Sequence, residues 1–224
     1  MKKLIALILC IAVCFALGGC SKTPNPEGTY VRQLYNELYP VALSTYLEFP
    51  RESKIEIEKA DEDYTFRSSG VEGTAKINDT GKLVCKHEDS FTGEKESTKY
   101  IIYKDYLIDE DDKSDIDIVD GKLPGEGKNR DCTVDITDDT KSYDNFSITF
   151  HENGNFEYKA SSTYYDYFDW FYIKGTYEVK GKIFVLTYNE IMINGDKFNP
   201  ENKLENVYVY IDGDDLYDEV FVKQ

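Results

Sequence analysis

Two stretches of the chain, about one hundred residues apart, carry the same alternation of apolar and polar residues. Residues 45–57 align without a gap on residues 146–158, with apolar residues meeting apolar residues. Apolar residues at every second position are typical of β-strands with one buried face. The polar middles, residues 51–54 and 152–155, have turn chemistry, and the second contains Asn-Gly-Asn. The sequence therefore predicts a hairpin in both stretches.

The likeness continues in the same order further along the chain. Gly73-Thr74 is matched by Gly175-Thr176, and each is followed by a Gly-Lys turn and an apolar strand. Each copy closes with a Tyr-rich strand, an acidic turn and a short final strand. An ordered series of matches predicts a duplicated domain. We expect one domain at residues 28–119 and another at residues 129–224, joined by a Gly- and Pro-bearing linker at residues 120–128.

The opening of the first copy breaks this pattern. Val31, Leu34, Tyr35 and Leu38 follow helical spacing, and Pro40 would end a helix. Either a short helix replaces the opening strand of the first copy, or the alignment fails at this point. We favour the short helix.

This order of strands and turns resembles that of the lipocalin-like domains of small secreted bacterial proteins. The resemblance covers residues 129–224 more fully than residues 28–119. It implies antiparallel up-and-down barrels of about eight short strands, with a two-sheet sandwich as the competing architecture. The expected fold class is all-β, with two tandem barrels or sandwiches.

The first twenty residues have the organisation of an export signal. Two lysines precede an apolar run that ends at Leu17, shorter than the ~20 residues of a membrane-spanning helix. The run ends in Leu-Gly-Gly-Cys, which resembles the lipobox of bacterial lipoproteins; an ordinary signal peptide is the alternative. The resemblance implies removal of residues 1–19 and acylation of Cys20. Two or more acyl chains anchor a protein firmly, and residues 20–27 are expected to form a polar tether.

The negative net charge of the chain limits its possible partners and its means of membrane attachment. The chain has 43 acidic and 26 basic residues, a formal net charge of -17. Such a chain repels phosphate backbones, which argues against nucleic acid as a partner. It also repels anionic lipid head groups, so membrane attachment would depend on the lipid anchor. We expect a lipid-anchored protein on the extracytoplasmic side of the cell membrane, either extracellular or periplasmic.

Two cysteines remain in the body of the protein after acylation of Cys20. A disulfide between Cys85 and Cys132 is possible in an oxidising compartment. However, Cys85 lies in an apolar strand pattern, and we favour a small buried side chain there. Neither residue belongs to a CxxC pair.

Catalytic and metal-binding motifs are missing from the sequence. It has no HExxH, GxSxG or phosphate-binding motif, and His87 and His151 occupy unrelated positions in the two copies. The acidic residues 109–115 lack the Gly and Glu that a calcium loop needs, which favours a solvated charged loop. We therefore predict a non-catalytic protein without a metal or cofactor.

The strongest candidate for a binding surface is an aromatic segment in the second copy. Residues 163–172 hold seven aromatic side chains, including the only Trp. Strand alternation would place Trp170 and Tyr172 on one face and Phe171 on the other, so some rings should be exposed. Exposed rings can stack on sugars or apolar ligands; packing of the second face against the other domain or a loop is the alternative. The candidate ligand-binding residues are Tyr164, Tyr165, Tyr167 and Trp170.

These features leave two functions open. The first is a binding module of the cell envelope, contacting an envelope glycan, a small apolar ligand or a protein partner. The alternative is a structural or inhibitory surface protein that recognises another protein through a sheet face. A barrel with an open lumen would favour the first function, and a filled interior would favour the second.

Overall fold

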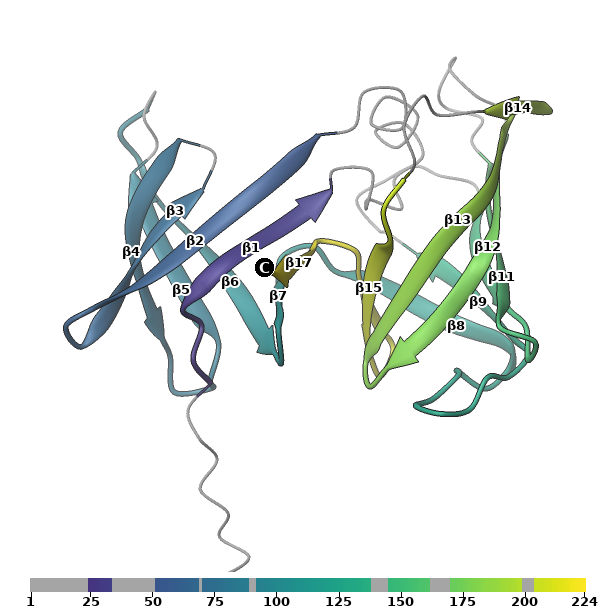
Figure 1. Cartoon of the computed structure of the whole chain (residues 1–224), viewed down its shortest axis with the longest axis horizontal. Coiled ribbons are helices and arrows are strands. Elements are labelled where there is room, and N and C mark those ends of the chain that lie inside the picture. Colours follow the sequence, from purple (N-terminus) through teal and green to yellow (C-terminus); the bar gives the residue numbers. More distant parts are fainter. Residues whose placement is uncertain are drawn as a thin grey trace, which may run out of the picture.

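The chain forms two β-barrels that lie side by side (Figure 1). The structure is a computed structural model, and it describes residues 24–33, 51–68, 70–88, 92–137, 145–161, 170–198 and 204–224. Every regular element in these residues is a strand, which confirms the predicted all-β class. The signal peptide and Cys20 lie outside the described residues.

The first barrel is a closed ring of antiparallel strands, in the order β1-β2-β3-β4-β5-β6-β7-β17. Seven of them follow one another along the chain, and the eighth comes from the C-terminal end. The strands are β1 (Gly28–Gln33), β2 (Glu52–Ala60), β3 (Asp63–Ser68), β4 (Val71–Ile77), β5 (Leu83–Glu88), β6 (Lys95–Tyr103), β7 (Tyr106–Asp109) and β17 (Val220–Lys223).

The second barrel is also closed, because β12 pairs with both β11 and β13. Its ring order is β8-β9-β10-β11-β12-β13-β15-β16, and the short β14 extends the β13 hairpin outside the ring. Two closed barrels, rather than sandwiches, are therefore the architecture. The strands are β8 (Ser114–Gly121), β9 (Cys132–Thr137), β10 (Asn145–Phe150), β11 (Asn155–Ser161), β12 (Trp170–Lys180), β13 (Ile183–Ile193), β14 (Asp196–Phe198), β15 (Val207–Asp212) and β16 (Asp215–Tyr217).

The division between the barrels differs from the linker expected at residues 120–128. Strand β8 pairs with β9 and β16, so the second barrel begins at Ser114. Strand β17 pairs with β1 and β7, so the last strand belongs to the first barrel. The Gly- and Pro-bearing stretch is the loop of the β8–β9 hairpin, where Gly125 bridges to Lys128. Composition marks such a loop, but it does not tell a hairpin loop from a linker.

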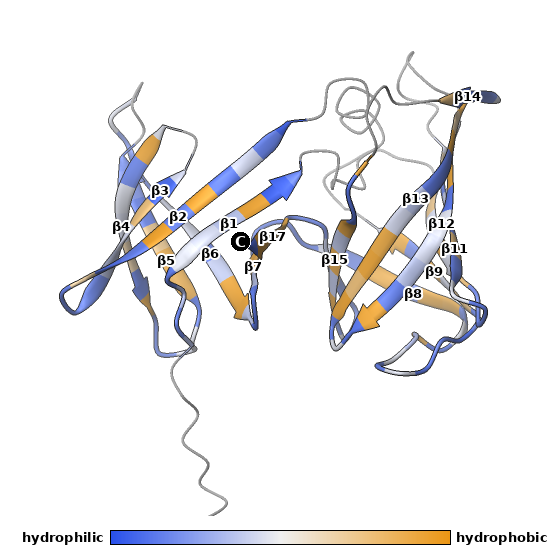
Figure 2. Ribbon diagram, viewed as in Figure 1, coloured by the Kyte–Doolittle hydropathy of each residue, from blue (hydrophilic) through white to orange (hydrophobic). Residues whose placement is uncertain are grey.

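Side chains fill the interior of both barrels. In Figure 2, apolar and polar residues alternate along the strands of both. The largest apolar side chains are almost fully shielded, and each contributes about 1.5–3 kcal/mol by leaving water. They include Tyr30, Ile55, Ile57 and Leu83 in the first barrel, and Phe150, Phe156, Tyr158 and Phe171 in the second.

A third apolar cluster joins the barrels. It consists of Ile108, Ile183, Val185, Tyr210, Tyr217 and Val220. Tyrosine rings border it, with the Tyr103 ring centroid 5.5 Å from that of Tyr210. The Tyr103 hydroxyl accepts a hydrogen bond from the Lys182 backbone N–H at 3.2 Å. The two barrels therefore share one packed face.

The strand register confirms the internal repeat. In each barrel, four residues on four adjacent strands are paired in one row across the sheet. In order, they are an apolar residue, a phenylalanine, a glycine and a residue with an aromatic or imidazole ring. These residues are Ile57, Phe66, Gly73 and His87 in the first barrel, and Phe150, Phe156, Gly175 and Tyr188 in the second. At either glycine, a Cβ would overlap a carbonyl oxygen of the neighbouring strand, so the same close approach occurs twice.

Two local predictions for the first copy are wrong. Residues 52–54 are not a turn but the start of β2, where they pair with β1. Ile57 therefore takes the place of Phe150 and not of Tyr158, one strand away from the predicted alignment. The helix is also wrong where it can be seen, because Val31 pairs with Lys54 inside β1; residues 34–50 lie outside the described residues. The predicted turn in the second copy is confirmed, since the Gly154 N–H donates to the His151 carbonyl at 3.0 Å.

Candidate functional site

Strand β12 begins with Trp170, Phe171 and Tyr172, the last three residues of the predicted aromatic segment. The Phe171 side chain faces the barrel interior and is 1% exposed, whereas Trp170 is 37% exposed and Tyr172 is half-buried on the outer face. This alternation agrees with the predicted faces. Tyr164, Tyr165 and Tyr167 lie outside the described residues.

The outer face beside Trp170 is hollowed into a mainly apolar groove of about 350 Å³. It crosses β10, β11 and β12, whose register places Ser147, Lys159 and Tyr172 in one row and Ser161 next to Trp170. The lining residues are Ser147, Lys159, Ala160, Ser161, Trp170, Phe171 and Tyr172.

The β13–β14 turn holds the backbone of Trp170 in place. The Trp170 N–H donates to Asn194 Oδ1 at 3.1 Å, and the Asn194 N–H donates to the Trp170 carbonyl at 3.0 Å. A Cβ at Gly195 would come within 3.6 Å of the indole Cζ2, so the ring lies against this turn. Two strands and a tight turn therefore position the exposed ring before any ligand arrives.

Two lysines flank the Tyr172 ring on the groove side of the barrel. The Lys174 and Lys159 ammonium groups lie 5.2 Å and 5.5 Å from the ring centroid. Burial and a hydrogen bond to Glu157 raise the pKa of the Tyr172 hydroxyl. Because the phenol stays neutral, the groove offers ring faces together with hydrogen-bonding groups, the combination that suits sugars.

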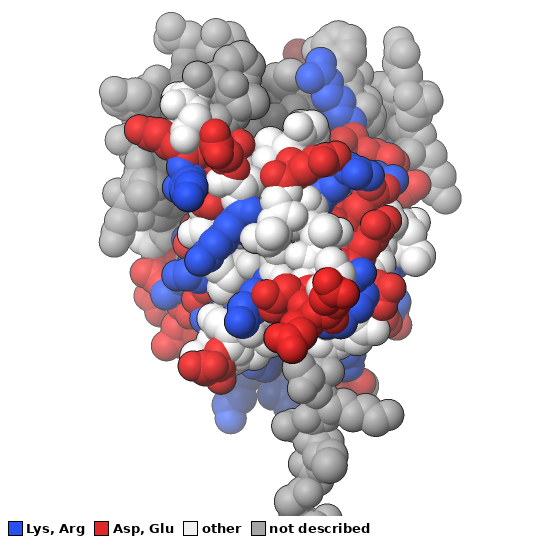
Figure 3. Space-filling model, turned by 90° about the vertical axis from the view of Figure 1, so that its left-hand side faces the viewer, with Lys and Arg blue, Asp and Glu red and all other residues white. Residues whose placement is uncertain are grey.

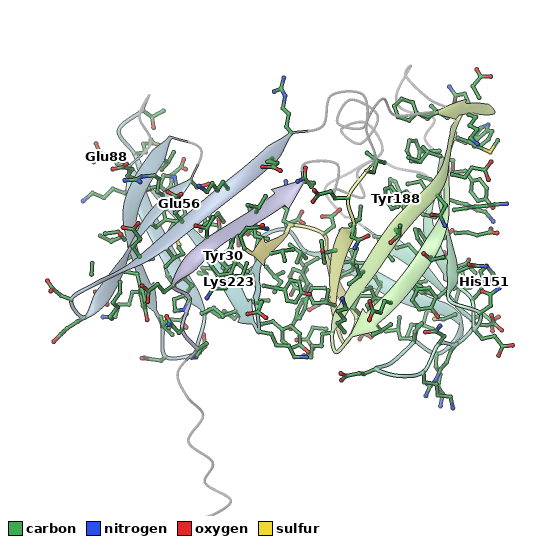
Figure 4. The ribbon with its side chains drawn as sticks, in the orientation of Figure 1. Tyr30, Glu56, Glu88, His151, Tyr188 and Lys223 are labelled. Atoms are coloured by element: carbon green, nitrogen blue, oxygen red, sulfur yellow. The ribbon has the colours of Figure 1, made fainter. Side chains whose placement is uncertain are left out.

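The first barrel has a larger groove of different character. A hollow of about 570 Å³ lies over β4, β5 and β6, and charged residues such as Glu72, Lys86 and Glu96 line it together with Glu88 (Figure 4). The neighbouring face carries acidic and basic side chains close together (Figure 3). Arg67 there reaches Glu72 at 2.7 Å. Exposed pairs of this kind contribute little to stability.

An ion pair between a buried arginine and a half-buried glutamate closes the first barrel. Arg32 is 4% exposed and points inward from β1. Its Nη1 lies 2.9 Å from Glu219 Oε1, and its guanidinium lies 5.5 Å from the Phe221 ring centroid. These contacts bind the C-terminal strand to the first strand, so the group is structural.

The acidic residues 109–115 form one of the two connections between the barrels. Burial raises the pKa of Asp109 to about 6, although the Asp111 N–H donates to its carboxylate. Asp112 Oδ2 accepts from the Glu219 N–H at 2.8 Å. The loop is therefore more tightly bonded than the solvated loop we predicted. Among the described residues, no group of three or more His, Cys, Asp or Glu side chains is placed to hold a metal ion.

The cysteines and histidines do not form a reactive site. Cys85 and Cys132 are free thiols buried in different barrels, so the favoured prediction for Cys85 is confirmed and a disulfide between them is not formed. Burial raises the pKa of the Cys85 thiol to about 12. His87 Nε2 lies 3.2 Å from Glu96 in the first barrel, whereas His151 lies at a surface turn of the second (Figure 4).

The sequence predicted the exposed Trp170 but missed the side chains around it. Lys159, Ser161 and Asn194 come from other strands and turns. The only local signal was the outward position of Lys159 in an alternating strand and the Asn-Gly turn at residue 194.

Comparison with known proteins adds no assignment. No protein-family model, no curated protein and no solved structure matches the chain significantly. In the described part of the chain, no helix has the length and apolar character needed to cross a membrane.

Proposed function

We propose that this chain is a lipid-anchored, extracytoplasmic and non-catalytic binding protein, which binds its ligand on the outer face of the second barrel. Cys20 would carry the lipid, and residues 21–27 would hold the barrels off the membrane. The ligand class that suits the surface is an envelope glycan or a small apolar molecule.

The observation that carries this proposal is the groove beside Trp170 and Tyr172. Its volume, about 350 Å³, lies within the range of ligand-binding clefts. The feature belongs to one copy of the repeat only. Strand β12 extends five residues before Gly175, to Trp170, whereas β4 begins at Val71, two residues before the equivalent Gly73, so β4 has no position that corresponds to Trp170. An aromatic surface added to one of two similar barrels supports a role in binding rather than in folding.

The filled interiors of the two barrels favour binding on an outer surface. Because Tyr158 and Phe171 occupy the lumen of the second barrel, an outer surface is a better binding place than the lumen. The same observation favours a second candidate function, in which the outer sheet face recognises another protein.

The groove can be tested with purified peptidoglycan sacculi in a co-sedimentation assay. We expect Trp170→Ala combined with Tyr172→Ala to lower the affinity at least tenfold, because stacking contributes ~0.5–1.5 kcal/mol for each ring beyond its buried area. Val119→Ala is the matched control, since Val119 is exposed but lies on β8, outside the groove. Native mass spectrometry of the purified protein would detect an apolar ligand.

A folded double variant with parental affinity for sacculi, and with the same co-purifying ligands, would exclude the groove as the binding site. Circular dichroism should establish folding, because Trp170 is the only tryptophan and its fluorescence is lost. Binding to a purified envelope protein but to neither glycan nor apolar ligand would support the second candidate function.

The anchor needs its own experiment. Cells given a labelled fatty acid should incorporate it into the parent protein, and Cys20→Ser should abolish the incorporation. Equal labelling of both proteins would refute acylation at Cys20.

A further inference from the structure

Among the described residues, part of β8 has a neighbouring strand on one side only. Strand β16 pairs with β8 only at Ser114 and Asp115, after which the Ile116 N–H donates to the Asp214 carbonyl at 2.8 Å. Strand β9 continues to pair on the other side as far as Gly121. Within the described ranges, no strand pairs with the open side of residues 117–121.

The open side presents backbone hydrogen-bonding groups. In an antiparallel strand, the N–H and C=O groups of successive residues point alternately to the two sides. Because the Ile116 N–H points toward β16, the N–H and C=O of Ile118 point to the open side as well. An added strand would find this donor and acceptor in place.

Apolar side chains are exposed at the same edge. Ile118 pairs with Val134, which faces the interior and is 1% exposed, yet Ile118 itself is 40% exposed because β16 stops short of it. Val119, at an irregularity in the strand register, is 59% exposed. Ile118 and Val119 are two of the three large apolar residues that the described part of the chain exposes, and Trp170 is the third.

The charges beside this edge favour a basic partner. Asp117 lies directly opposite Asp135, and like charges in such pairs are destabilising. Neither aspartate forms an ion pair with a described residue. Two residues earlier in β8, Asp115 lies opposite Asp215 of β16. There Lys113 Nζ lies 3.5 Å from the Asp115 carboxylate and 2.8 Å from the Asp215 carboxylate. The first acidic pair thus lacks the lysine that the second has.

We propose that residues 117–121 are a strand-addition site for an extended, lysine-bearing segment of another protein. The added strand would pair with the open side of β8, cover Ile118 and bring an ammonium group to Asp117 and Asp135. A second copy of this chain is a poor occupant, because two β8 edges would bring their aspartates together. This site is separate from the aromatic groove and does not depend on it.

The probe for the test is a fluorescent peptide of six residues that alternates lysine and valine. The control peptide has the same side chains but carries N-methyl groups on alternate backbone nitrogens, which prevents strand pairing and keeps the charge. We expect the first peptide to bind at least tenfold more tightly than the second, and to protect the Ile118 amide from hydrogen exchange. Trp170→Ala should leave this binding unchanged.

Two sets of variants test separately the acidic side chains and the unpaired edge of β8. Asp117→Lys combined with Asp135→Lys, which reverses the charge of the acidic pair, should weaken binding of the lysine peptide at least tenfold and favour a glutamate–valine peptide instead. Ile118→Lys, which places a charge on the edge as natural sheets do to block pairing, should abolish both. Equal binding of the methylated and unmethylated peptides, no binding of either, or protection elsewhere on the protein would overturn the proposal. Self-association that Ile118→Lys removes would also overturn it, by assigning the edge to a second copy.

Discussion

Removal of the Phe221 ring should loosen strands that lie more than 130 residues earlier in the chain. Phe221 lies three residues before the last residue of the sequence, on β17, and its side chain is 4% exposed in the core of the first barrel. Its ring meets Tyr100 edge-on, with the centroids 6.1 Å apart and an interplanar angle of 89°. The first barrel therefore depends on a segment that follows the whole second barrel.

The expected magnitude follows from these contacts. Phe→Ala in a packed core lowers the free energy of unfolding by ~3–5 kcal/mol. Within that range, the aromatic pair accounts for ~0.5–1.5 kcal/mol. We therefore expect Phe221→Ala to destabilise the first barrel by about 4 kcal/mol, which corresponds to amide exchange about 10³-fold faster in its protected strands.

Hydrogen exchange measured by mass spectrometry on peptides from each barrel is the appropriate assay. Peptides from β3 and β4 should exchange faster in Phe221→Ala, although they lie far from residue 221 in sequence. Val222→Ala is the control, because this neighbouring side chain is half-buried and points away from the core, and its loss should cost about 1 kcal/mol or less. Parental exchange rates in β3 and β4 of a folded Phe221→Ala protein would refute the placement of β17 in the first barrel.

Three other outcomes follow from the structure. The pKa of Asp109 is about 6 in the folded protein, above its ordinary value of 3.8. This group should therefore raise the free energy of unfolding as the pH falls from about 6 to 3.8. In urea unfolding, the free energy of unfolding should differ less between pH 5 and pH 7 in Asp109→Asn than in the parent. The Cys85 thiol, with its pKa raised to about 12, should react with iodoacetamide at least a hundredfold more slowly in native protein than in urea; equal rates would contradict its burial. Gly73→Ala and Gly175→Ala should each lower the melting temperature by several degrees, because the new methyl group overlaps a carbonyl of the next strand, whereas Gly125→Ala, with open space around it, should not.

Alternation along the sequence predicted the faces of strands but not their neighbours. Ile148 and Phe150 were expected to share a buried face, and both point into the second barrel. Apolar and polar residues alternate in the same way in many of the strands. An alignment that matches a strand to the neighbour of its true counterpart therefore still pairs apolar residues with apolar residues. This is why residues 52–57 were matched to the wrong strand of the second copy, and why the short alternating β17 gave no sign of the barrel to which it belongs.

Where the predicted helix is wrong, at Val31 in β1, the cause lies in one buried charge. In β1, Tyr30 and Arg32 both face the barrel interior. A charged residue in an inward position hides the strand alternation and leaves only the helical spacing of the apolar residues visible. The partner that makes burial of Arg32 tolerable is Glu219, which lies 187 positions further along the chain. Local sequence patterns carry no information on such a pair.

The binding groove shows the same limit. Exposure of Trp170 followed from the number of aromatic residues in one short segment of the sequence and could be predicted. The partners Lys159 and Asn194 depend on the register of β11 and on the fold of the β13–β14 turn. Residues on one strand can be assigned to a face from sequence, but a groove needs at least two strands in known register.

The repeat also explains why the C-terminal strand is needed by the first barrel. In the ring of the second barrel, β8 lies between β9 and β16, and the corresponding place in the first barrel, between β1 and β7, is filled by β17. A first strand of its own would have to precede β1, but residues 24–27 form no strand there. Instead, the Pro26 carbonyl accepts a hydrogen bond from the buried Tyr30 hydroxyl at 3.0 Å, and the Gln224 N–H donates to the Thr29 carbonyl. Because the barrel is completed from the far end of the chain, residues 24–27 form none of its strands, and the proposed tether can lead to a lipid without interrupting the ring.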